Sequence, residues 1–351
     1  MTSPDPARLD VLAPNFKRRF SGVTSTVLRL VPLQAREIAI ASCGPRLPDD
    51  LPQIRMRQLL SMSRSGPSGA RVWHARRNTE MLAGLALKVL LRKRLKLLFT
   101  SAAQRRHTPY TRWLIRQMDA VIATSARSAS WLEREAEVIH HGIDTTSFAP
   151  PADRDALRRD LGLDPGAVIV GCFGRVRAQK GTDLFVEAML RVLPDRPAVH
   201  AIIMGGVTTD QERFATDLEA RIAASGLGDR LRILPDDTGF SIAPWFQALD
   251  LYVAPQRWEG FGLTPLEAMA CEVPVVATRV GAFEELVSDA ETGVLVDPED
   301  LSGLVAGIER YLDDADRRKA HGAAARARAL DKFRIEDEAA AITAIYRRLL
   351  A

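Results

Sequence analysis

The stretch Leu251-Tyr-Val-Ala-Pro-Gln-Arg-Trp-Glu-Gly-Phe-Gly-Leu-Thr-Pro-Leu-Glu-Ala-Met-Ala270 combines a strand, a glycine loop and a helix in direct succession. The apolar run at 251–254 has the length of a buried strand, and it ends at Pro255. Thr264 and Pro265 then begin a helix, because proline is well tolerated in a first turn, where its missing N–H is not needed. Strands that lead through short loops into helices build parallel α/β sheets, so this stretch predicts that architecture.

Strand-like and helix-like segments alternate on both sides of this stretch, in two series. In the second half the predicted strands are 168–173, 199–204, 231–234, 251–254, 274–277 and 293–296. The predicted helices there are 183–193, 211–225, 242–248, 263–271, 282–286, 301–313 and 317–331. The first half has predicted strands at 10–13, 37–41, 72–74, 97–100, 120–124 and 137–139, and helices at 79–93 and 111–118. This pattern predicts two Rossmann-like parallel-sheet domains in tandem, with a ligand outside the carboxyl ends of the strands.

A predicted linker separates the two series. The segment His141-Gly-Ile-Asp-Thr-Thr-Ser-Phe-Ala-Pro-Pro151 interrupts the alternation with a glycine and a pair of prolines. We therefore expect one domain over residues 1–145 and a second over residues 152–335.

Charge divides the chain unevenly. Residues 1–150 hold 24 Lys and Arg against 11 Asp and Glu, a net charge of +13. The other 201 residues hold 24 against 33, or −9, and the two parts recover the overall +4. A basic first domain suggests an anionic partner, which could be a membrane surface, an acidic glycan or nucleic acid.

Composition also indicates the cellular location of the protein. No apolar run approaches the roughly 20 residues that span a bilayer, and the N-terminus lacks the pattern of a secretory signal. Cys43, Cys172 and Cys271 are scattered, which is typical of buried thiols in a reducing cytoplasm rather than of disulfides or a zinc site. We expect a cytoplasmic protein.

The segment Gly171-Cys-Phe-Gly-Arg-Val-Arg-Ala-Gln-Lys-Gly181 is the first candidate for binding chemistry. Gly174 follows a buried strand and allows close approach of the backbone to a ligand. Arg175 can bind a phosphate through two N–H groups, and Lys180 adds a point charge where a helix begins. Such a loop suits a diphosphate, although it lacks the order of a P-loop. An ordinary loop with surface cations would have the same sequence.

Glu259 and Glu267 mark the second candidate, in the stretch quoted first. Carboxylates accept hydrogen bonds from neighbouring hydroxyls, so one could bind a sugar and the other a ribose. The amides of Gly260, Phe261, Gly262 and Leu263 offer donors to an anion between them. A helix cap preceded by two glycines is the alternative interpretation.

Together these two motifs resemble the retaining glycosyltransferases of family 4, which have the two-domain GT-B fold. That family has a Gly-Arg…Lys-Gly loop and two glutamates separated by seven residues, as in Gly174-Arg175…Lys180-Gly181 and Glu259…Glu267. The linker resembles the family's turn between domains. The resemblance implies that the final helix, 336–351, packs back on the first domain.

The resemblance also implies roles for individual residues. Arg175 and Lys180 would hold the donor diphosphate and stabilise it as a leaving group. Glu259 would bind the donor sugar and complete the catalytic set, while Glu267 would bind the ribose. The remaining donor contacts implied are Gly22, Gly174, Gly205, Gly260, Phe261, Gly262 and Leu263, with the base near 233–236.

The first domain shows a narrower resemblance. The glycine loop Phe20-Ser-Gly-Val-Thr-Ser-Thr26 resembles that of family 4. The combination of Trp73-His-Ala-Arg-Arg-Asn-Thr-Glu-Met81 with Phe99-Thr-Ser-Ala-Ala-Gln-Arg105 is similar to segments of lipopolysaccharide core mannosyltransferases. Relatives often have a histidine where Ser101 or Ala102 stands here. The implied donor is GDP-mannose, and the implied acceptor is an acidic core sugar on a lipid. The acceptor contacts would come from His74, Arg76, Arg77, Arg105 and Arg106.

A membrane contact is also expected. The segment 88–98 mixes cations with leucines, as a helix on a membrane surface does, although the pattern favours a core helix that leads into a strand. Peripheral contact with the inner face of the cytoplasmic membrane would suit a lipid-linked acceptor.

We recognise no cluster of His, Cys, Asp or Glu with metal-ligand spacing in the sequence, so we expect neither a metal nor another cofactor. Several alternatives remain open: a family 4 enzyme that uses a UDP- or ADP-sugar, a sugar-phosphate epimerase of the same fold, an inactive binding module, or a basic nucleic-acid- or membrane-binding protein without catalysis. The glutamate spacing favours a transferase, and no nucleic-acid-binding motif is recognisable.

Overall fold

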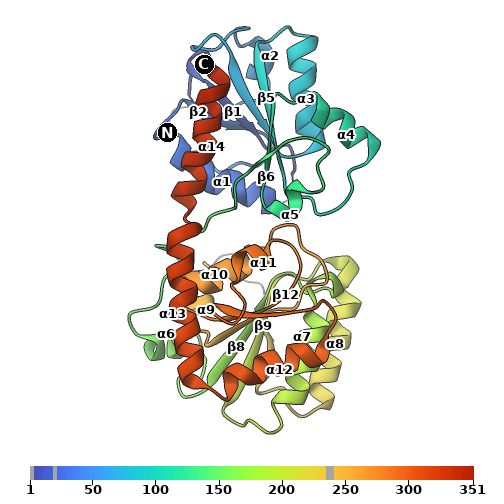
Figure 1. The fold of residues 1–351 in the computed structure, drawn as a ribbon, viewed down its shortest axis with the longest axis vertical. Helices are drawn as coiled ribbons and strands as arrows, with labels where there is room; N and C mark the ends of the chain where they lie inside the picture. Colours follow the sequence, from blue (N-terminus) through green and yellow to red (C-terminus); the bar gives the residue numbers. More distant parts are fainter. Residues whose placement is uncertain (1–3, 19–21, 235–240) are drawn as a thin grey trace. The chain divides into compact units, whose positions relative to one another are not determined.

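The structure is a computed structural model that describes residues 4–18, 22–234 and 241–351. The chain divides into two compact units (Figure 1). Unit 1 comprises the described part of Met1–Gly142 together with Ile335–Ala351, and unit 2 is the continuous segment Ile143–Arg334.

Unit 1 contains a seven-stranded, entirely parallel sheet among its described residues, in the order β3-β2-β1-β4-β5-β6-β7. The strands are β1 Val11–Pro14, β2 Ile40–Cys43, β3 Gln53–Ile54, β4 Arg71–Ala75, β5 Leu95–Ser101, β6 Ala120–Ala123 and β7 Glu137–Val138. The direction of strand addition reverses between β1 and β4. The loops that follow these two strands therefore border a crevice at the carboxyl edge of the sheet.

Helices cover both faces of this sheet (Figure 1). They are η1 Pro6–Arg8, α1 Gly22–Gln34, α2 Gln58–Ser61, α3 Asn78–Val89, α4 Pro109–Arg116, α5 Ala126–Ala129 and α14 Ile335–Leu350. In α14, Ile335, Ala339, Ile342 and Tyr346 recur at helical spacing, and all four are buried in one core cluster with Val27 of α1. The C-terminal helix is therefore an integral part of unit 1.

A buried histidine ties α14 to the sheet. His74 Nδ1 lies 2.6 Å from the Tyr346 hydroxyl, and His74 Nε2 lies 2.7 Å from the Thr100 hydroxyl. Burial, with a smaller contribution from the Arg76 guanidinium, lowers the pKa of His74 well below its usual value. The ring is neutral in the fold and links β4, β5 and α14.

This burial predicts a pH-dependent contribution of His74 to stability. The unfolded ring binds a proton below about pH 6.5, whereas the folded ring does not, so stability falls as pH drops below that value. We expect the stability advantage of the wild type over His74→Gln to shrink by about 1 kcal/mol per pH unit below 6.5. Denaturant unfolding at several pH values measures this difference. A difference that is independent of pH would contradict the assignment.

Unit 2 contains a six-stranded parallel sheet among its described residues, in the order β10-β9-β8-β11-β12-β13. Its strands are β8 Val168–Phe173, β9 Val199–Met204, β10 Leu231–Leu234, β11 Leu251–Ala254, β12 Val275–Thr278 and β13 Gly293–Val296. This is the dinucleotide-binding order of doubly wound sheets, with the reversal between β8 and β11.

Helices again pack on both faces, over two core clusters (Figure 1). They are α6 Arg154–Asp160, η2 Ala178–Lys180, α7 Thr182–Val192, η3 Thr209–Gln211, α8 Glu212–Ala224, α9 Ala243–Gln247, α10 Thr264–Ala270, α11 Phe283–Leu286, α12 Leu301–Leu312 and α13 Ala315–Lys332. Cys172 and Cys271 are buried in unit 2, and Cys43 is buried in unit 1.

The predicted α/β class with parallel sheets is confirmed. Predicted strands of unit 2 agree with the structure to within one residue. In unit 1 the predicted helix 79–93 ends early, at Val89, and an exposed turn precedes β5. The prediction did not include α1 or α6. In the part of the chain that the structure describes, no helix is both long and apolar enough to cross a membrane.

Candidate active site

The loops after β8 and β11 meet at the point where the strand order of unit 2 reverses. Gly181, in the loop after β8, has a φ of +70°, and a side chain there would place its Cβ 1.9 Å from the Pro255 carbonyl oxygen. Only glycine allows this approach of the two loops. Both predicted donor motifs therefore border the same crevice.

Two further glycines shape the β8 side of this crevice. Gly174 has a φ of +137°, and its N–H donates to the Met204 carbonyl at 2.9 Å. A Cβ at Gly205, after β9, would lie 1.8 Å from the Gly174 carbonyl oxygen. The tight packing of these two loops is therefore sufficient reason for glycine at position 205, whether or not it contacts a donor.

Lys180 and Glu259 form an ion pair between the two loops, with Lys180 Nζ on Glu259 Oε2. The other oxygen, Oε1, accepts a hydrogen bond from the Gly260 N–H at 2.9 Å. The two side chains are 21% and 15% exposed, so both are accessible to a ligand yet largely shielded from solvent. The structure thus brings together a cation and a carboxylate that lie 79 residues apart in the chain.

Glycines also hold Glu259 from its other side. A Cβ at Gly262, whose φ is +88°, would lie 2.8 Å from Glu259 Cγ and 2.2 Å from the Phe283 ring. At Gly281, whose φ is +62°, a Cβ would lie 3.1 Å from Glu259 Cβ. Gly281 was missed in the sequence, because its role depends on the folded position of a loop after β12.

Arg257 stiffens the β11 loop, and sequence reasoning missed this residue as well. Its guanidinium binds both Asp183 carboxylate oxygens, at 2.7 and 2.8 Å, and its backbone N–H donates to the Gln179 carbonyl at 3.0 Å. Gln179 in turn donates to the Trp258 carbonyl at 3.2 Å. These contacts fasten the two loops beside the Lys180–Glu259 pair.

The other predicted donor residues lie on the loop after β8, on α10 and the loop before it, and in unit 1. Arg175 directly follows Gly174 and has an exposed side chain. Glu267 lies in the first turn of α10 and is half-buried. Gly260, Gly262 and Leu263 are also half-buried, whereas Phe261 is buried. In unit 1, Gly22 begins α1, and a Cβ there would meet no described atom within 4 Å.

In unit 1 the structure argues against an acceptor contact for His74. The side chain has no exposed surface, and both ring nitrogens are engaged within the core. A histidine at the end of a buried strand cannot be distinguished from a ligand-binding one by sequence alone.

Arg77 is also committed to the fold. Its Nη1 donates to Asn15 Oδ1 at 2.8 Å and to the buried Glu80 carboxylate at 2.7 Å, and its Nη2 donates to the Thr24 hydroxyl at 3.3 Å. The guanidinium therefore holds the β1 loop, α1 and α3 together, and its predicted acceptor contact would compete with these bonds.

Arg76 is different, although only 8% of its surface is exposed. It lines a cavity of about 60 Å³ at the carboxyl edge of the sheet, next to Thr100 and His141. Its Nη2 is buried and has no hydrogen-bond partner among the described residues. An anionic group could satisfy it.

Arg105 and Arg106 are exposed on the loop between β5 and α4. Their neighbour His107 is half-buried, and burial together with the Arg105 charge lowers its pKa. On α4, Tyr110 and Trp113 are stacked with ring centroids 6.3 Å apart and are 48% and 46% exposed. This surface thus presents both guanidiniums and flat aromatic rings.

Parts of the predicted site lie outside the described residues. Phe20 and Ser21 of the glycine loop are among them, as are Pro235 and Asp236 near the predicted base. Within the described ranges, no group of three or more His, Cys, Asp or Glu side chains could hold a metal ion.

Doubly wound sheets bind nucleotides at the point where the strand order reverses, and in unit 2 a cation and a carboxylate meet there. Residues 153–328 match the model of the family described as glycosyl transferases group 1. The chain belongs to this family and is a glycosyltransferase.

Two curated relatives match almost the whole chain. Lipopolysaccharide core biosynthesis mannosyltransferase LpsB of Rhizobium meliloti (strain 1021) is 52% identical over 97% of this chain and 98% of its own length. Lipopolysaccharide core biosynthesis mannosyltransferase LpcC of Rhizobium leguminosarum bv. viciae is 51% identical over 99% and 98%.

Solved structures confirm the GT-B fold. Anabaena HepE, in a crystal structure with UDP, superposes with a TM-score of 0.83 at 20% identity, covering 97% of this chain and 100% of that one. The C-terminal domain of the Francisella tularensis glycosyl transferase group 1 protein LpcC is 32% identical over 55% of this chain and 100% of its own, with a TM-score of 0.53.

Glu267 provides a test of the predicted ribose contact. If its carboxylate accepts hydrogen bonds from the ribose hydroxyls, Glu267→Ala should weaken free-nucleotide binding by about 1.5–3 kcal/mol. Calorimetry with the nucleoside diphosphate measures this, with Glu272→Ala, at a half-buried position in the turn after the same helix, as the control. Unchanged affinity in Glu267→Ala would refute the assignment.

Proposed function

We propose that this chain is a retaining mannosyltransferase that transfers mannose from GDP-mannose to an acidic sugar of the lipopolysaccharide core. The observation that supports this most strongly is identity above 50% over both units to two core mannosyltransferases. By contrast, the D-inositol 3-phosphate glycosyltransferase of Xylanimonas cellulosilytica is 34% identical over only 65% of the chain. In this proposal unit 1 binds the acceptor, so enzymes that share an acceptor are expected to be similar along the whole of unit 1.

In this proposal the donor lies at the crevice of unit 2. Lys180 and Arg175 neutralise the diphosphate, Glu267 binds the ribose and Glu259 accepts hydrogen bonds from the mannose hydroxyls. As the bond between C1 and the diphosphate oxygen breaks, negative charge grows on the leaving group next to these cations. The acceptor oxygen forms its new bond to C1 on the same face, and its proton passes to the departing phosphate oxygen.

The acceptor surface in this proposal belongs to unit 1. Arg105 and Arg106 supply charge for an acidic sugar, while Tyr110 and Trp113 offer flat apolar faces to sugar rings. The net charge of +13 over residues 1–150 is in keeping with such a partner. A lipid-linked acceptor also implies work at the inner face of the cytoplasmic membrane.

A donor panel tests the proposal directly. Purified protein would be incubated with GDP-mannose, UDP-glucose, UDP-N-acetylglucosamine or ADP-heptose and a lipid A acceptor carrying a keto-deoxy sugar acid. We expect transfer from GDP-mannose alone, with the new linkage α by NMR. Transfer from a UDP- or ADP-sugar would show that the donor is not GDP-mannose. A β linkage would show that the enzyme does not retain the anomeric configuration of the donor.

Activity should not depend on a divalent metal, because Arg175 and Lys180 carry the charge that neutralises the diphosphate. Transfer in excess EDTA is expected to match transfer in Mg²⁺ or Mn²⁺ to within about twofold, whereas a metal-clamped diphosphate would require the ion. Complete loss in the chelator, restored by added metal, would overturn this expectation.

A further inference from the structure

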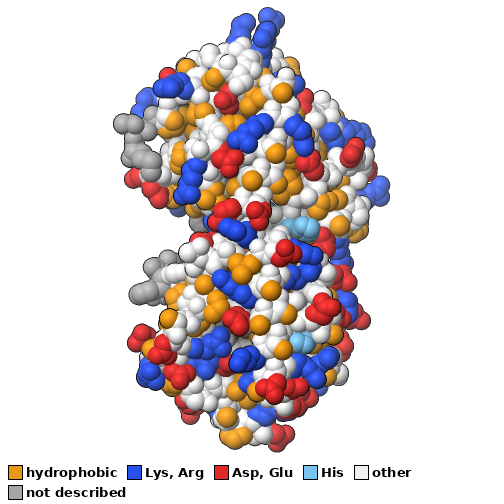
Figure 2. Space-filling view, turned by 60° about the vertical axis from the view of Figure 1, so that its left-hand side comes forward, with side chains coloured by type: hydrophobic (Ala, Val, Ile, Leu, Met, Phe, Trp, Pro, Cys, Tyr) orange, Lys and Arg blue, Asp and Glu red, His pale blue; other side chains and the backbone are white. Residues whose placement is uncertain are grey.

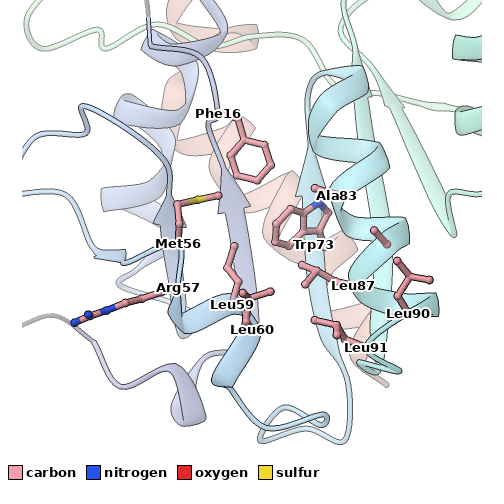
Figure 3. A pocket seen from close by; sticks show the side chains of 11 residues that line it. Phe16, Met56, Arg57, Leu59, Leu60, Trp73, Ala83, Leu87, Leu90 and Leu91 are labelled. Carbon is pink, nitrogen blue, oxygen red and sulfur yellow. The ribbon is translucent and has the colours of Figure 1, made fainter.

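An open apolar groove runs between α2 and α3 of unit 1 (Figure 3). Its volume is about 570 Å³, within the range of roughly 300–1,000 Å³ that small-molecule pockets occupy. Trp73 and Leu59 form its floor, and both are buried. Leu60, Leu90 and Leu91 line it as well, and they are 65%, 76% and 39% exposed. So many exposed leucines around one hollow are unusual for a surface in contact only with water.

Hydrogen bonds join the two sides of the groove. The buried Lys93 ammonium donates to the Leu60 carbonyl at 3.0 Å and to the Met62 carbonyl, which joins the end of α2 to the turn after α3. The Arg94 N–H donates to the Arg64 carbonyl at 2.8 Å, across the same junction. These hydrogen bonds fix the positions of the two segments that carry the exposed leucines.

The segment that carries most of the groove, residues 51–100, is strongly cationic. Residues 51–100 contain eleven Lys and Arg but a single acidic residue, Glu80. Glu80 is buried, and its oxygens accept from the Arg77 guanidinium and the Arg76 N–H. Arg57 lines the groove, and its guanidinium points away from the apolar floor in Figure 3. Arg92, directly after Leu91, is also exposed.

We propose that this groove docks the protein on an anionic phospholipid bilayer, with Leu60, Leu90 and Leu91 inserted among acyl chains and the surrounding arginines on headgroup phosphates. The combination of exposed leucines with a cation-rich segment is what binds such a surface, whereas a protein partner would be expected to bring matching polar contacts. On the face of unit 1 that Figure 2 shows, acidic side chains lie among the Lys and Arg ones, in contrast to the composition of residues 51–100. The docking surface is independent of the sugar that is transferred.

Vesicle co-sedimentation tests the proposal with the full chain. Wild-type protein should bind vesicles of phosphatidylcholine with phosphatidylglycerol, bind pure phosphatidylcholine at least about tenfold more weakly, and lose affinity as salt rises. Leu60→Ser with Leu90→Ser, and separately Arg57→Glu with Arg92→Glu, should each weaken binding by at least about tenfold.

Matched controls separate docking from folding and from catalysis. Leu82→Ser changes another exposed leucine of α3 that does not line the groove, and Arg213→Glu reverses an exposed arginine of unit 2. Both should bind vesicles like the wild type. All variants should release nucleotide from the donor at the wild-type rate, so a failure of the proposed function would leave the vesicle result interpretable.

Two outcomes would overturn the proposal. One is equal binding of the wild type and the leucine variant to anionic vesicles. The other is sedimentation of the wild type as a dimer that the leucine variant loses, because the groove would then be occupied by a second copy of the chain.

Discussion

Replacing Lys180 by alanine is expected to lower kcat by about 100- to 1,000-fold, the range found when one charge-stabilising donor is removed from an active site. Lys180 lies beside Gly174, at the mouth of the crevice, and reaches Glu259 across the two loops. In the proposed mechanism its charge stabilises the departing diphosphate, so kcat should fall more than KM rises. Steady-state kinetics over a range of donor concentrations measures both.

Two comparisons sharpen this expectation. Lys332→Ala, at an exposed position on α13, should leave both constants unchanged. Arg175→Ala should follow Lys180→Ala in direction, because both side chains would act on the same leaving group. If either active-site variant changed KM alone, the side chain would bind the donor and the transition state equally well. That result would contradict a role in stabilising the leaving group.

Reversing Arg105 and Arg106 to glutamate should abolish transfer to an acidic acceptor, by more than about 100-fold, while donor binding and slow donor hydrolysis persist. Two positive charges become two negative ones on an exposed loop, so an anion that was attracted is now repelled. For the wild type, raising the salt concentration should weaken acceptor binding, because added ions screen the arginine charges. The Debye length is about 8 Å at physiological ionic strength and shortens as salt is added. Acceptor-dependent transfer and donor hydrolysis would be measured separately.

Arg8→Glu with Arg36→Glu is the matched control, because both residues are exposed in unit 1 and the net charge changes equally. Wild-type transfer by the control together with loss in the Arg105/Arg106 variant would locate the effect on the loop after β5. Transfer at the wild-type rate by the Arg105/Arg106 variant would mean that the basic surface serves another purpose.

The sheets and the donor crevice could be predicted because short apolar runs and glycine loops record them locally. Leu251–Ala254 and the Gly-x-Gly loop after it needed no tertiary information. α1 was missed because its sequence, GVTSTVLRLVPLQ, is rich in residues with low helix propensity and contains Pro32, so it depends on packing against α14 for its stability.

The roles of individual polar residues were less predictable. His74 lies near the end of β4 and Arg77 follows that strand, as ligand-binding residues would. Contacts of His74 with Tyr346 and of Arg77 with the buried Glu80 nevertheless give both side chains a structural role. Conversely, Arg257 lies within the strand–loop–helix stretch 251–270, but its partner Asp183 is 74 residues away in the chain. Pairings of this kind depend on the tertiary structure and leave no local signal.

The return of α14 to unit 1 has a consequence for the order of folding during synthesis. Residues of unit 1 emerge first from the ribosome, but Val27 and its neighbours lack their cover until α14 has been made. Unit 2 is continuous, and its two ends are paired, with the Ile143 N–H donating to the Phe333 carbonyl at 2.8 Å. It can therefore close while the N-terminal unit still exposes apolar surface. The part of the protein that is made first is the last to be completed, and a chain that stops short of Ile335 would leave that surface bare.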